Sequence, residues 1–512
     1  MTSCKTVTDP KAPEKSILYF PKGFAIPEAE SQLAIKCSVR LEHLPNVITR
    51  LGGLKANQIE PHGLLYLPHP YVVPGGMFNE MYGWDSYFIL RGLLEAGKVG
   101  LARGIVENFF FEIDHYGGFL NANRGYVLAR SQPPFLTSMI RAVYDSEKAE
   151  GREDSAWLEE AYPYAVKDYE LWVREPHLAG DTGLSRYYAF GNGPAPELGA
   201  DTKSYFRGVA RYFLLHPAEA GPYLTRVGGM PSAPNLTGPE YSVRICDAGA
   251  SPASAKDCDA VEKVGLTSEF YKGDRSMRES GFDISFRFGP YGAGTHHYAA
   301  VGLNSLLYKV EKDLQWMSAQ LGKKEESAQW AERAEKRRAA VTQYLWNGER
   351  GLFFDYDFTK HAQSSYVYIT TFYPLWTGLA TPRQAQAVEK SLKLFEKPGG
   401  LLTSLRKTSA QWDYPYGWAP TILIAIEGLR RYGFDKDADR CSYEFLSDVI
   451  ENFRRDHTIR EKYNVVTSSS ETQVTVGYAG NQVGFGWTNG AFLVLLHALP
   501  PAWKHRLDAL PN

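Results

Sequence analysis

Four segments of the chain combine glycine, proline and aromatic residues with carboxylates. The first is PGGMFNEMYGWDSY at 74–87, and the second is ESGFD at 279–283. The third is QWDYPYGWAP at 411–420, and the fourth consists of EKY at 461–463 together with GFGWTNG at 484–490. Aromatic rings stack on the flat C–H faces of sugars, while carboxylates hold sugar hydroxyls. Four such segments together favour a carbohydrate pocket over a set of separate structural corners.

The overall composition agrees with such a pocket and excludes other classes of protein. Aromatic residues make up 13% of the 512 residues, which is a weak sign of sugar binding that a large aromatic core would also produce. The 56 basic and 58 acidic residues leave a formal charge of -2, so the basic surface of a nucleic-acid-binding protein is absent. No apolar run approaches the roughly 18 residues of a membrane span. We expect a soluble monomer with a small carbohydrate substrate and with no nucleic-acid or membrane partner.

Neither histidines nor cysteines show the spacing of a metal site. His296 and His297 are adjacent, and neighbouring side chains point in different directions, so without a further ligand we expect no metal there. The five cysteines form no CxxC pair. The spacing of these residues therefore predicts no metal site.

The compartment is left open by the sequence. Cys246 and Cys258 fall in one stretch rich in Gly, Pro and Ser, where a disulfide would indicate an oxidising compartment and two buried thiols would not. The first residues, MTSCKTVTDPKAPEK, lack the apolar core of a signal peptide, although a chain already trimmed of its signal would look the same. A periplasmic or secreted location is expected, with the cytoplasm as the alternative.

Helices must position the four segments, because apolar residues recur at steps of three and four along most of the chain. One run extends from Leu303 to Met317 and stops at Gly322, and a second run extends from Trp330 to Leu345, which predicts a helical hairpin. Similar patterns predict helices at 84–96, 101–113, 135–144, 157–173, 384–395, 421–432, 437–453 and 489–499. The pairs favour an all-α toroid, with a bundle or globin-like arrangement as the competing fold.

Two parts of the chain differ from these helical pairs. Residues 1–60 are expected to form an N-terminal arm packed on the main domain at 61–512. The region from about 214 to 278 is rich in Pro, Gly and Ser. We interpret it as a long inserted lid or loop region, because connections of this length are usually functional.

The segments also resemble a known family. PGGxFxExYxWDxY closely resembles the first signature of the trehalase family, glycoside hydrolase family 37, and QWDYPYGWAP resembles the second. ESGFD, EKYNV and GFGWTNG fall in the family's order and spacing, so the similarity covers about residues 70–512. The resemblance implies an (α/α)6 toroid and an inverting hydrolase that splits trehalose into two glucoses without metal or cofactor.

Residue roles follow from the same resemblance. Inverting hydrolysis needs an acid that protonates the leaving oxygen and a base that activates water, and sequence spacing alone does not identify this pair. By resemblance, Asp283 matches the general acid and Glu461 the general base. The start of the helix predicted at 84–96 would also suit Asp85 as an N-cap, and both roles are compatible. The residues matched to the glucose site are Phe78, Trp84, Asp85, Asn121, Arg130, Gln132, Glu197 and Gly281, with Trp412 and Trp418 as stacking platforms.

Two positions and one segment depart from the family pattern. The family has arginine where this chain has Met77 and Ala195, and a glutamate in the glycine-rich segment that corresponds to 472–483, where this chain has no obvious equivalent. Hydrogen bonds from charged groups contribute about 1.5–3 kcal/mol each, so trehalose binding is expected to weaken unless other groups replace the arginines. Candidates for that replacement are Arg244, Arg275, Arg278 and Arg287.

Three hypotheses follow. The first is an inverting hydrolase of trehalase type that acts on trehalose. The second is an exo-acting α-glucosidase for another α-glucoside or disaccharide. The third is a sugar-binding protein without catalysis, which retention of both Asp283 and Glu461 argues against.

Overall fold

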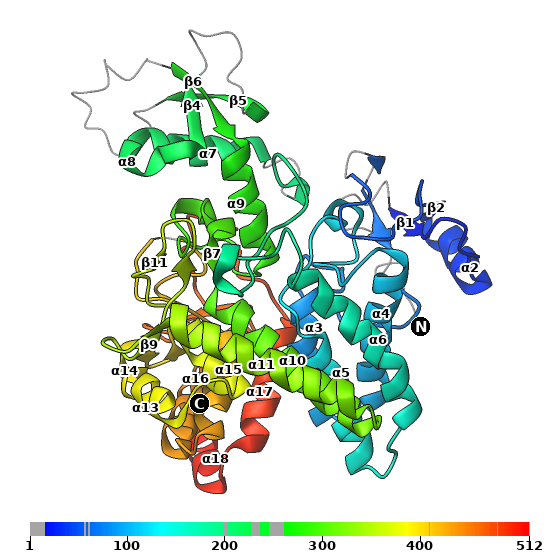
Figure 1. Ribbon diagram of the computed structural model, residues 1–512, viewed down its shortest axis with the longest axis vertical. Coiled ribbons are helices and arrows are strands. Elements are labelled where there is room, and N and C mark those ends of the chain that lie inside the picture. Colours follow the sequence, from blue (N-terminus) through cyan, green and yellow to red (C-terminus); the bar gives the residue numbers. More distant parts are fainter. Residues whose placement is uncertain are drawn as a thin grey trace.

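A computed structural model describes residues 16–55, 58–59, 62–197, 202–226, 236–244, 261–408, 410–478 and 480–510. Six helices form a closed inner ring, in which each helix contacts the next and the last contacts the first. Figure 1 shows the two ends of this ring, drawn in blue and red, side by side. The ring consists of α3 (Gly83–Glu95), α5 (Leu136–Ala149), α10 (Val301–Gln320), α12 (Tyr373–Thr377), α15 (Ala419–Arg431) and α17 (Gly486–Ala498).

A second layer of helices surrounds the inner ring. An outer helix follows each inner one along the chain, as the packing of α11 against α10 and of α16 against α15 illustrates. The arrangement is an (α/α)6 toroid, and the predicted hairpin at 303–345 is confirmed. The helix predicted at 384–395 is instead two helices that meet at Ser391. The outer helices are α4 (Val99–His115), α6 (Ser155–Trp172), α11 (Lys324–Tyr344), α13 (Pro382–Lys390), α14 (Leu392–Phe395), α16 (Asp435–Asp456) and α18 (Pro501–Asp508).

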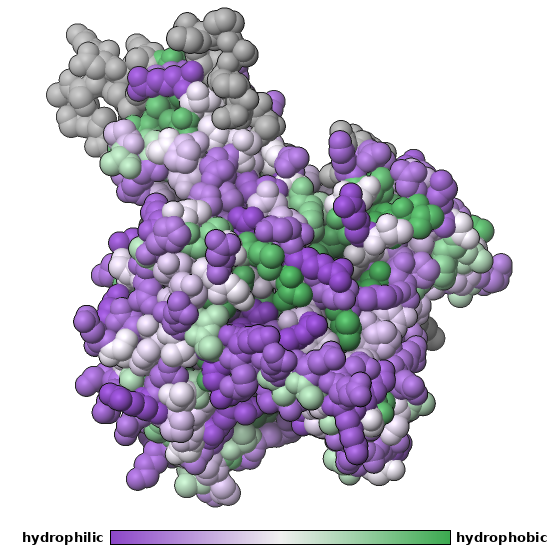
Figure 2. All heavy atoms as spheres, in the orientation of Figure 1, coloured by the Kyte–Doolittle hydropathy of each residue, from purple (hydrophilic) through white to green (hydrophobic). Residues whose placement is uncertain are grey.

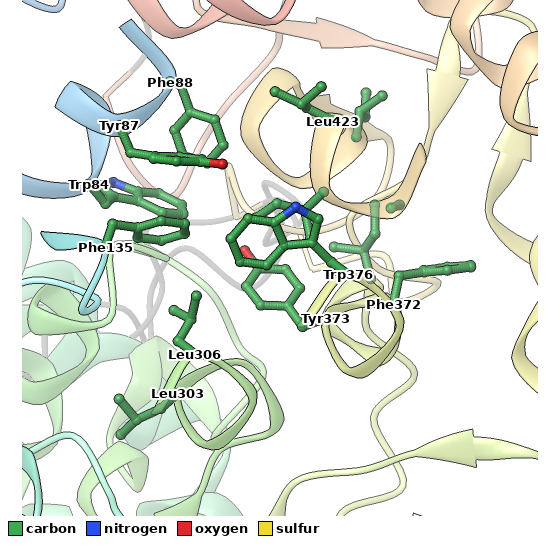
Figure 3. Close-up of a cluster of buried hydrophobic side chains, with 14 of the residues drawn as sticks. Trp84, Tyr87, Phe88, Phe135, Leu303, Leu306, Phe372, Tyr373, Trp376 and Leu423 are labelled. Carbon is green, nitrogen blue, oxygen red and sulfur yellow. The ribbon is translucent and has the colours of Figure 1, made fainter. Parts of the chain in front are cut away.

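Large apolar side chains fill the centre of the ring. Figure 3 shows Trp84 and Phe88 of α3 near Phe135, with Leu303 of α10 and Trp376 of α12 facing them. All of these side chains are buried. The first eight residues of α15, APTILIAI, are buried on every side, as expected for a helix without a solvent-facing stripe.

The N-terminal region forms a small parallel sheet on one edge of the toroid. Its strands lie in the order β2-β1-β3, and Leu18 pairs with both Leu41 and Leu64. Alternate residues of β1 share a core with Tyr116 and Leu120, which follow α4. The elements are β1 (Ile17–Phe20), α2 (Glu28–Cys37), β2 (Arg40–His43) and β3 (Leu64–Leu65).

The described part of 214–278 is more regular than the expected loop region. An antiparallel sheet in the order β4-β6-β5 packs on α7 and leads directly into α9, and Figure 1 shows this unit extending from the toroid. Alternate residues of β5, Tyr241 and Val243, are buried in a core of their own, and this period of two is the signal of a half-buried strand. The elements are α7 (Thr202–Leu215), α8 (Pro217–Ala220), β4 (Leu224–Arg226), β5 (Leu236–Arg244), β6 (Val261–Thr267) and α9 (Ser268–Glu279).

Short strands and 3-10 turns connect the helices. β14 pairs with β15 in antiparallel register, with Gly417 opposite Tyr463, so two of the four sequence segments lie side by side. The short strands are β7 (Tyr298–Ala299), β8 (Trp346–Asn347), β9 (Leu352–Phe353), β10 (Tyr356–Asp357), β11 (Ala362–Gln363), β12 (Glu396–Lys397), β13 (Gly400–Leu401), β14 (Tyr416–Trp418) and β15 (Lys462–Asn464). The turns are η3 (Gly125–Val127), η4 (Gly180–Thr182), η6 (Gly221–Tyr223), η8 (Pro290–Gly292), η9 (Thr295–His297) and η10 (Ile369–Phe372).

None of the described helices combines the length and the apolar character that a membrane crossing requires.

Candidate active site

Four tryptophans meet where three inner helices begin. Trp84 lies in the first turn of α3, Trp412 and Trp418 precede α15, and Trp487 lies in the first turn of α17. Trp412 and Trp418 stack with ring centroids 3.8 Å apart, and Trp84 lies 5.8 Å from Trp412 and 5.9 Å from Trp487. Three of the four sequence segments thus share one aromatic cluster at this end of the ring.

The two predicted stacking platforms are both enclosed by protein. Trp418 has no exposed surface, because Trp412 stacks on it and the Lys462 ammonium lies 4.9 Å from its ring centroid. Trp412 is 2% exposed. In this conformation Trp418 supports Trp412 and could contact a sugar only if its neighbours moved.

Gly281 allows the segment before Asp283 to approach this cluster. Its φ of +77° lies in the left-handed region, which favours glycine. A Cβ at this position would lie 2.9 Å from Cε2 of Trp84. Glycine is therefore required here both for its backbone conformation and for the close contact.

The third sequence segment holds the backbone on both sides of Asp283. The Gln411 amide donates to the carbonyl of Asp283 at 2.5 Å, and the backbone N–H of Trp412 donates to the carbonyl of Ile284 at 3.2 Å. Asp413 accepts a hydrogen bond from the backbone N–H of Phe286 at 3.0 Å. The position of the Asp283 carboxyl therefore depends on the segment at 411–420.

Asp283, Asp85 and Glu461 lie within one electrostatic environment. Burial raises the pKa of Asp283 to about 6, although Arg278 and Arg130 act to lower it. Burial also raises the pKa of Asp85 well above its ordinary value, and the charges of Glu461 and Asp283 raise it further. Asp283 remains reachable from solvent, because 37% of its side chain is exposed. An acid that holds its proton up to a pH of about 6 is thus open to a ligand.

Both carboxylate oxygens of Glu461 have fixed partners. Lys462 Nζ lies 2.8 Å from Oε2, and the hydroxyl of Tyr478 donates to Oε1. Trp487 Nε1 donates to the backbone carbonyl of Glu461 at 2.9 Å. With only 1% of the residue exposed, Glu461 is held rigidly beside the aromatic cluster.

A chain of polar contacts joins four predicted or candidate residues to the acid. Arg130 lies 2.7 Å from Glu197 and donates to Asn121 Oδ1 at 3.1 Å. Arg278 lies 3.5 Å from Glu197 Oε1 and 3.9 Å from Asp283 Oδ2. Burial would raise the pKa of Glu197, but the charges of Arg130, Arg278 and Arg275 lower it to about 2. Glu197 is therefore ionised between two cations.

The start of α3 differs from one expectation. The helix begins at Gly83, so Asp85 lies inside the first turn and is not the N-cap. Gln132 instead satisfies this end of the helix, because its Oε1 accepts from the backbone N–H of Trp84 at 2.7 Å. Phe78 packs edge-on against Tyr478, with ring centroids 6.3 Å apart. Every predicted site residue is thus part of one connected region.

Of the four replacement arginines, only Arg278 reaches the predicted acid. Arg275 donates to the carbonyls of Gly193 and Pro194. Arg287 pairs with Asp355 at 2.6 Å, and Arg244 is exposed on β5.

The departures from the family pattern are also visible in the structure. Ala195 is fully buried, whereas 41% of Met77 is exposed. Met77 contributes its backbone N–H to Gln482 Oε1 at 3.2 Å. Neither side chain can supply the hydrogen bonds of an arginine.

Sequence reasoning missed Gln411, Lys462 and Tyr478. Gln411 and Lys462 lie within the quoted motifs, but only the folded structure shows that the Gln411 amide reaches the carbonyl of Asp283 and that the Lys462 ammonium turns toward the carboxylate of Glu461. Tyr478 lies in 472–483, where the family pattern has a carboxylate, and no local signal in the sequence marks this tyrosine as a partner of Glu461. Cys246 and Cys258, for which the sequence leaves a disulfide and two free thiols open, lie outside the described residues.

Comparisons with known proteins point to one family. The family model described as Trehalase matches residues 10–208 and 249–500. A probable trehalase of Eremothecium gossypii is 37% identical over 91% of this chain and 64% of its own length. A cytosolic neutral trehalase of Saccharomyces cerevisiae is 36% identical over 96% of this chain and 66% of its own length. The chain thus spans just under two thirds of these curated relatives.

Solved structures agree with the toroid. The neutral trehalase structure from Saccharomyces cerevisiae has a TM-score of 0.76 and 32% identity, and the match covers 99% of this chain and 91% of that one. A mannosylglycerate hydrolase from Thermus thermophilus has a TM-score of 0.52 and 16% identity over 83% of this chain and 95% of that one. This second likeness concerns the fold alone.

Proposed function

Because this chain belongs to the trehalase family, we propose that it hydrolyses trehalose to two glucose molecules with inversion at the attacked carbon. One observation carries the proposal: Asp283 and Glu461, far apart in the sequence, are both held at the tryptophan cluster. Gln411, next to Trp412, donates to the backbone carbonyl of Asp283, and Trp487 donates to that of Glu461. The named trehalases among its relatives support trehalose as the substrate. The predicted roles of the site residues are part of this proposal.

Asp283 serves as the general acid. Its carboxyl has a pKa of about 6 because of burial, so a substantial fraction is protonated in mildly acidic solution. In the reaction the proton passes from Asp283 to the glycosidic oxygen as the bond from that oxygen to the anomeric carbon breaks. The first glucose leaves with this proton.

Glu461 serves as the general base. It accepts a proton from a water molecule, whose oxygen bonds to the anomeric carbon on the face opposite the leaving group. The Lys462 ammonium and the Tyr478 hydroxyl hold the two oxygens of Glu461, which fixes the direction from which the proton is taken. One water is consumed, and both carboxyls regain their starting states after one proton exchange with solvent.

The polar chain and the aromatic cluster hold the sugar that is attacked. Glu197 is ionised between Arg130 and Arg278, which suits it to accept hydrogen bonds from sugar hydroxyls. Asn121 and Gln132 add amide groups at the same end of the ring. Phe78, which is partly exposed, provides the apolar wall, and the buried Trp84 supports it from behind.

Proton NMR of the anomeric signals tests the proposal. Purified protein is mixed with trehalose, and the first turnovers are followed before mutarotation mixes the anomers. Inverting hydrolysis releases α- and β-glucose in equal initial amounts. Release of α-glucose alone would contradict inversion, and no release would contradict trehalose as the substrate.

A second candidate function is hydrolysis of another α-glucoside. Met77 presents an exposed apolar side chain where the family pattern has an arginine, so this part of the site is less polar than the family pattern implies. A panel of α-linked disaccharides and α-glucosides with apolar leaving groups separates the two. A kcat/KM at least tenfold higher for another substrate than for trehalose favours this candidate.

Relatives from Saccharomyces cerevisiae and Pyricularia oryzae are named as cytosolic neutral trehalases, and this supports the cytoplasmic alternative over the periplasmic or secreted location. Fractionation of the source cells, followed by detection of the chain, distinguishes the two.

A further inference from the structure

Three side chains converge at the far end of α9 from the proposed acid. Glu269 lies in the first turn of α9, while His296 and His297 form the end of η9. Glu269 Oε1 is 3.0 Å from Nε2 of His296 and 2.8 Å from Nε2 of His297. The expectation that the adjacent histidines point apart is therefore wrong, because the 3-10 turn brings both rings to one carboxylate.

These three groups form a donor set that suits a divalent cation. Two imidazole nitrogens and one carboxylate oxygen bind zinc at bond lengths of about 2.0–2.2 Å, which puts tetrahedral ligand atoms about 3.3 Å apart. The observed separations of 2.8 and 3.0 Å therefore need to open by only a few tenths of an ångström. All three ligand atoms already lie within 4.8 Å of one another.

The three proposed ligands differ in how far they are exposed to solvent. The His296 side chain is 5% exposed, whereas those of His297 and Glu269 are 25% and 36% exposed. A buried ligand fixes the position of the ion, and two partly exposed ligands leave a path for its entry and room for water as a fourth ligand.

The nearby cations are already engaged elsewhere. Arg186 donates to the backbone carbonyls of Pro176 and His296. Lys272 Nζ donates hydrogen bonds to the backbone carbonyls of Ala189 and Gly191. Neither cation is paired with Glu269 in the described structure, whose contacts are with the two other proposed ligands, so no bond to Arg186 or Lys272 has to break when the carboxylate binds a metal.

A second group of metal-binding side chains is less suitable. Glu396, Cys441 and Glu444 also approach one another. Both oxygens of Glu396 are held by the guanidinium of Arg440, at 2.5 and 3.1 Å. A cation in this group would have to displace an existing ion pair.

We propose that Glu269, His296 and His297 bind one divalent cation of the zinc class. Glu269 and Arg278 are nine positions apart on α9, which is about 14 Å along a helix, so the ion lies away from the acid. Its role is structural: it ties the first turn of α9 to η9. The helix that it anchors carries Arg275 and Arg278 toward the proposed catalytic site.

Zinc titration of the full chain tests this proposal. The protein is freed of any purification tag, treated with EDTA, desalted and titrated with ZnCl2 by calorimetry. We expect one zinc per chain, and we expect Glu269→Gln and His297→Asn each to weaken that binding at least tenfold. Both substitutions are at partly exposed positions, which limits their effect on folding. His505→Asn, at an exposed histidine of α18, is the matched control and leaves binding unchanged, and so does Cys441→Ser.

A spectroscopic signal identifies the ligands independently of affinity. Co²⁺ added in place of zinc gives visible d–d bands in a site of low coordination number, and these bands disappear in the Glu269→Gln and His297→Asn variants. Less than one zinc per chain in the unaltered protein, or binding and spectra that both substitutions leave intact, overturns the proposal. Trehalose turnover plays no part in this test, so failure of the proposed hydrolysis leaves its outcome unaffected.

Discussion

At the scale of single residues, burial decides how the proposed acid behaves. The pKa of Asp283 is raised to about 6, and a general acid works only while it holds its proton. We therefore expect kcat/KM to fall as the pH rises through about 6, since deprotonation removes the acid. A pH profile of kcat/KM measures this decrease, which forms the alkaline limb of the profile. A kcat/KM that stays constant up to pH 8 would show that Asp283 is not the acid.

The pH at which this alkaline decrease occurs can be shifted by changing a charged residue near Asp283. The negative charge of Glu197 raises the pKa of Asp283, so Glu197→Gln lowers it and shifts the alkaline limb to lower pH. Glu197→Asp retains the charge and is the matched control, which keeps the limb closer to its original position.

Removing either proposed catalytic carboxyl should stop turnover. General acid or base catalysis contributes about 10²- to 10⁴-fold, so we expect Asp283→Asn and Glu461→Gln each to lower kcat at least about 10²-fold while circular dichroism shows an intact fold. The control Asp181→Asn changes an exposed carboxylate in η4 and leaves kcat unaltered. Retention of activity in either variant would remove that residue from the mechanism.

Tyr478 is expected to matter because it orients the proposed base. A hydrogen bond to a charged group contributes about 1.5–3 kcal/mol, so Tyr478→Phe should lower kcat about tenfold to hundredfold with a smaller change in KM. Steady-state kinetics measure the changes in kcat and KM separately. Tyr169→Phe removes a similar bond, from Tyr169 to Glu311 at 2.8 Å, at a distance from the site. It should affect thermal stability and leave kcat unchanged; equal losses of kcat in both variants would mean a general effect on the fold.

At the scale of the elements, the contact between α3 and α17 closes the ring. Gly490 of α17 approaches α3 so closely that a Cβ there would lie 2.0 Å from the Phe88 carbonyl oxygen. We expect Gly490→Ala to destabilise the protein by about 1–3 kcal/mol, because the helices must separate. The loss of activity should be larger than stability alone explains, since both helices carry tryptophans of the site. Denaturant unfolding and kinetics together measure the two effects.

A second helical glycine provides the comparison. Gly208 lies within α7, and a Cβ there would meet nothing within 4 Å. Gly208→Ala should therefore stabilise the protein by roughly 0.5–1 kcal/mol through helix propensity. If Gly490→Ala were equally harmless, close packing would not be what holds α17 against α3.

At the scale of the whole molecule, most large apolar side chains are buried, and each structural unit buries them in a hydrophobic core of its own. The toroid and the unit of α7, α9 and the three-stranded sheet each enclose their own core. The largest exposed apolar side chains, such as Ile35, Leu215 and Phe453, come from separate elements, and Figure 2 shows hydrophilic residues over most of the visible face. Scattered apolar residues of this kind are ordinary for a monomer.

We expect a monomer of 57.4 kDa in solution. Sedimentation velocity over a wide range of protein concentrations measures the mass directly. A dimer mass that persists on dilution would contradict this expectation and would indicate that one of the exposed apolar regions is an interface.

The sequence by itself predicted most of the long helices of the toroid, because the spacing of apolar residues depends only on neighbours a few positions apart. It did not predict the short inner helix α12, nor α7 and α9 of the inserted unit. It also predicted the sugar-site chemistry, from carboxylates and tryptophans gathered in a few segments, and the family pattern identified Asp283 and Glu461. Where local spacing was misleading, as for the helix at 384–395 and the sheet within 214–278, the sequence lacked the information about what each segment would pack against.

Only the tertiary structure decided which side chains meet. Each of these contacts joins residues that are distant along the chain or that point in different directions in an extended chain. They include the contact of α17 with α3, the hydrogen bond by which Gln132 satisfies the start of α3, the bond from Tyr478 to Glu461, and the convergence of Glu269 with His296 and His297. The physical reason is that helix packing sets these distances. A shift of a few ångströms between two helices would leave every local pattern unchanged and would still separate the groups that the chemistry requires.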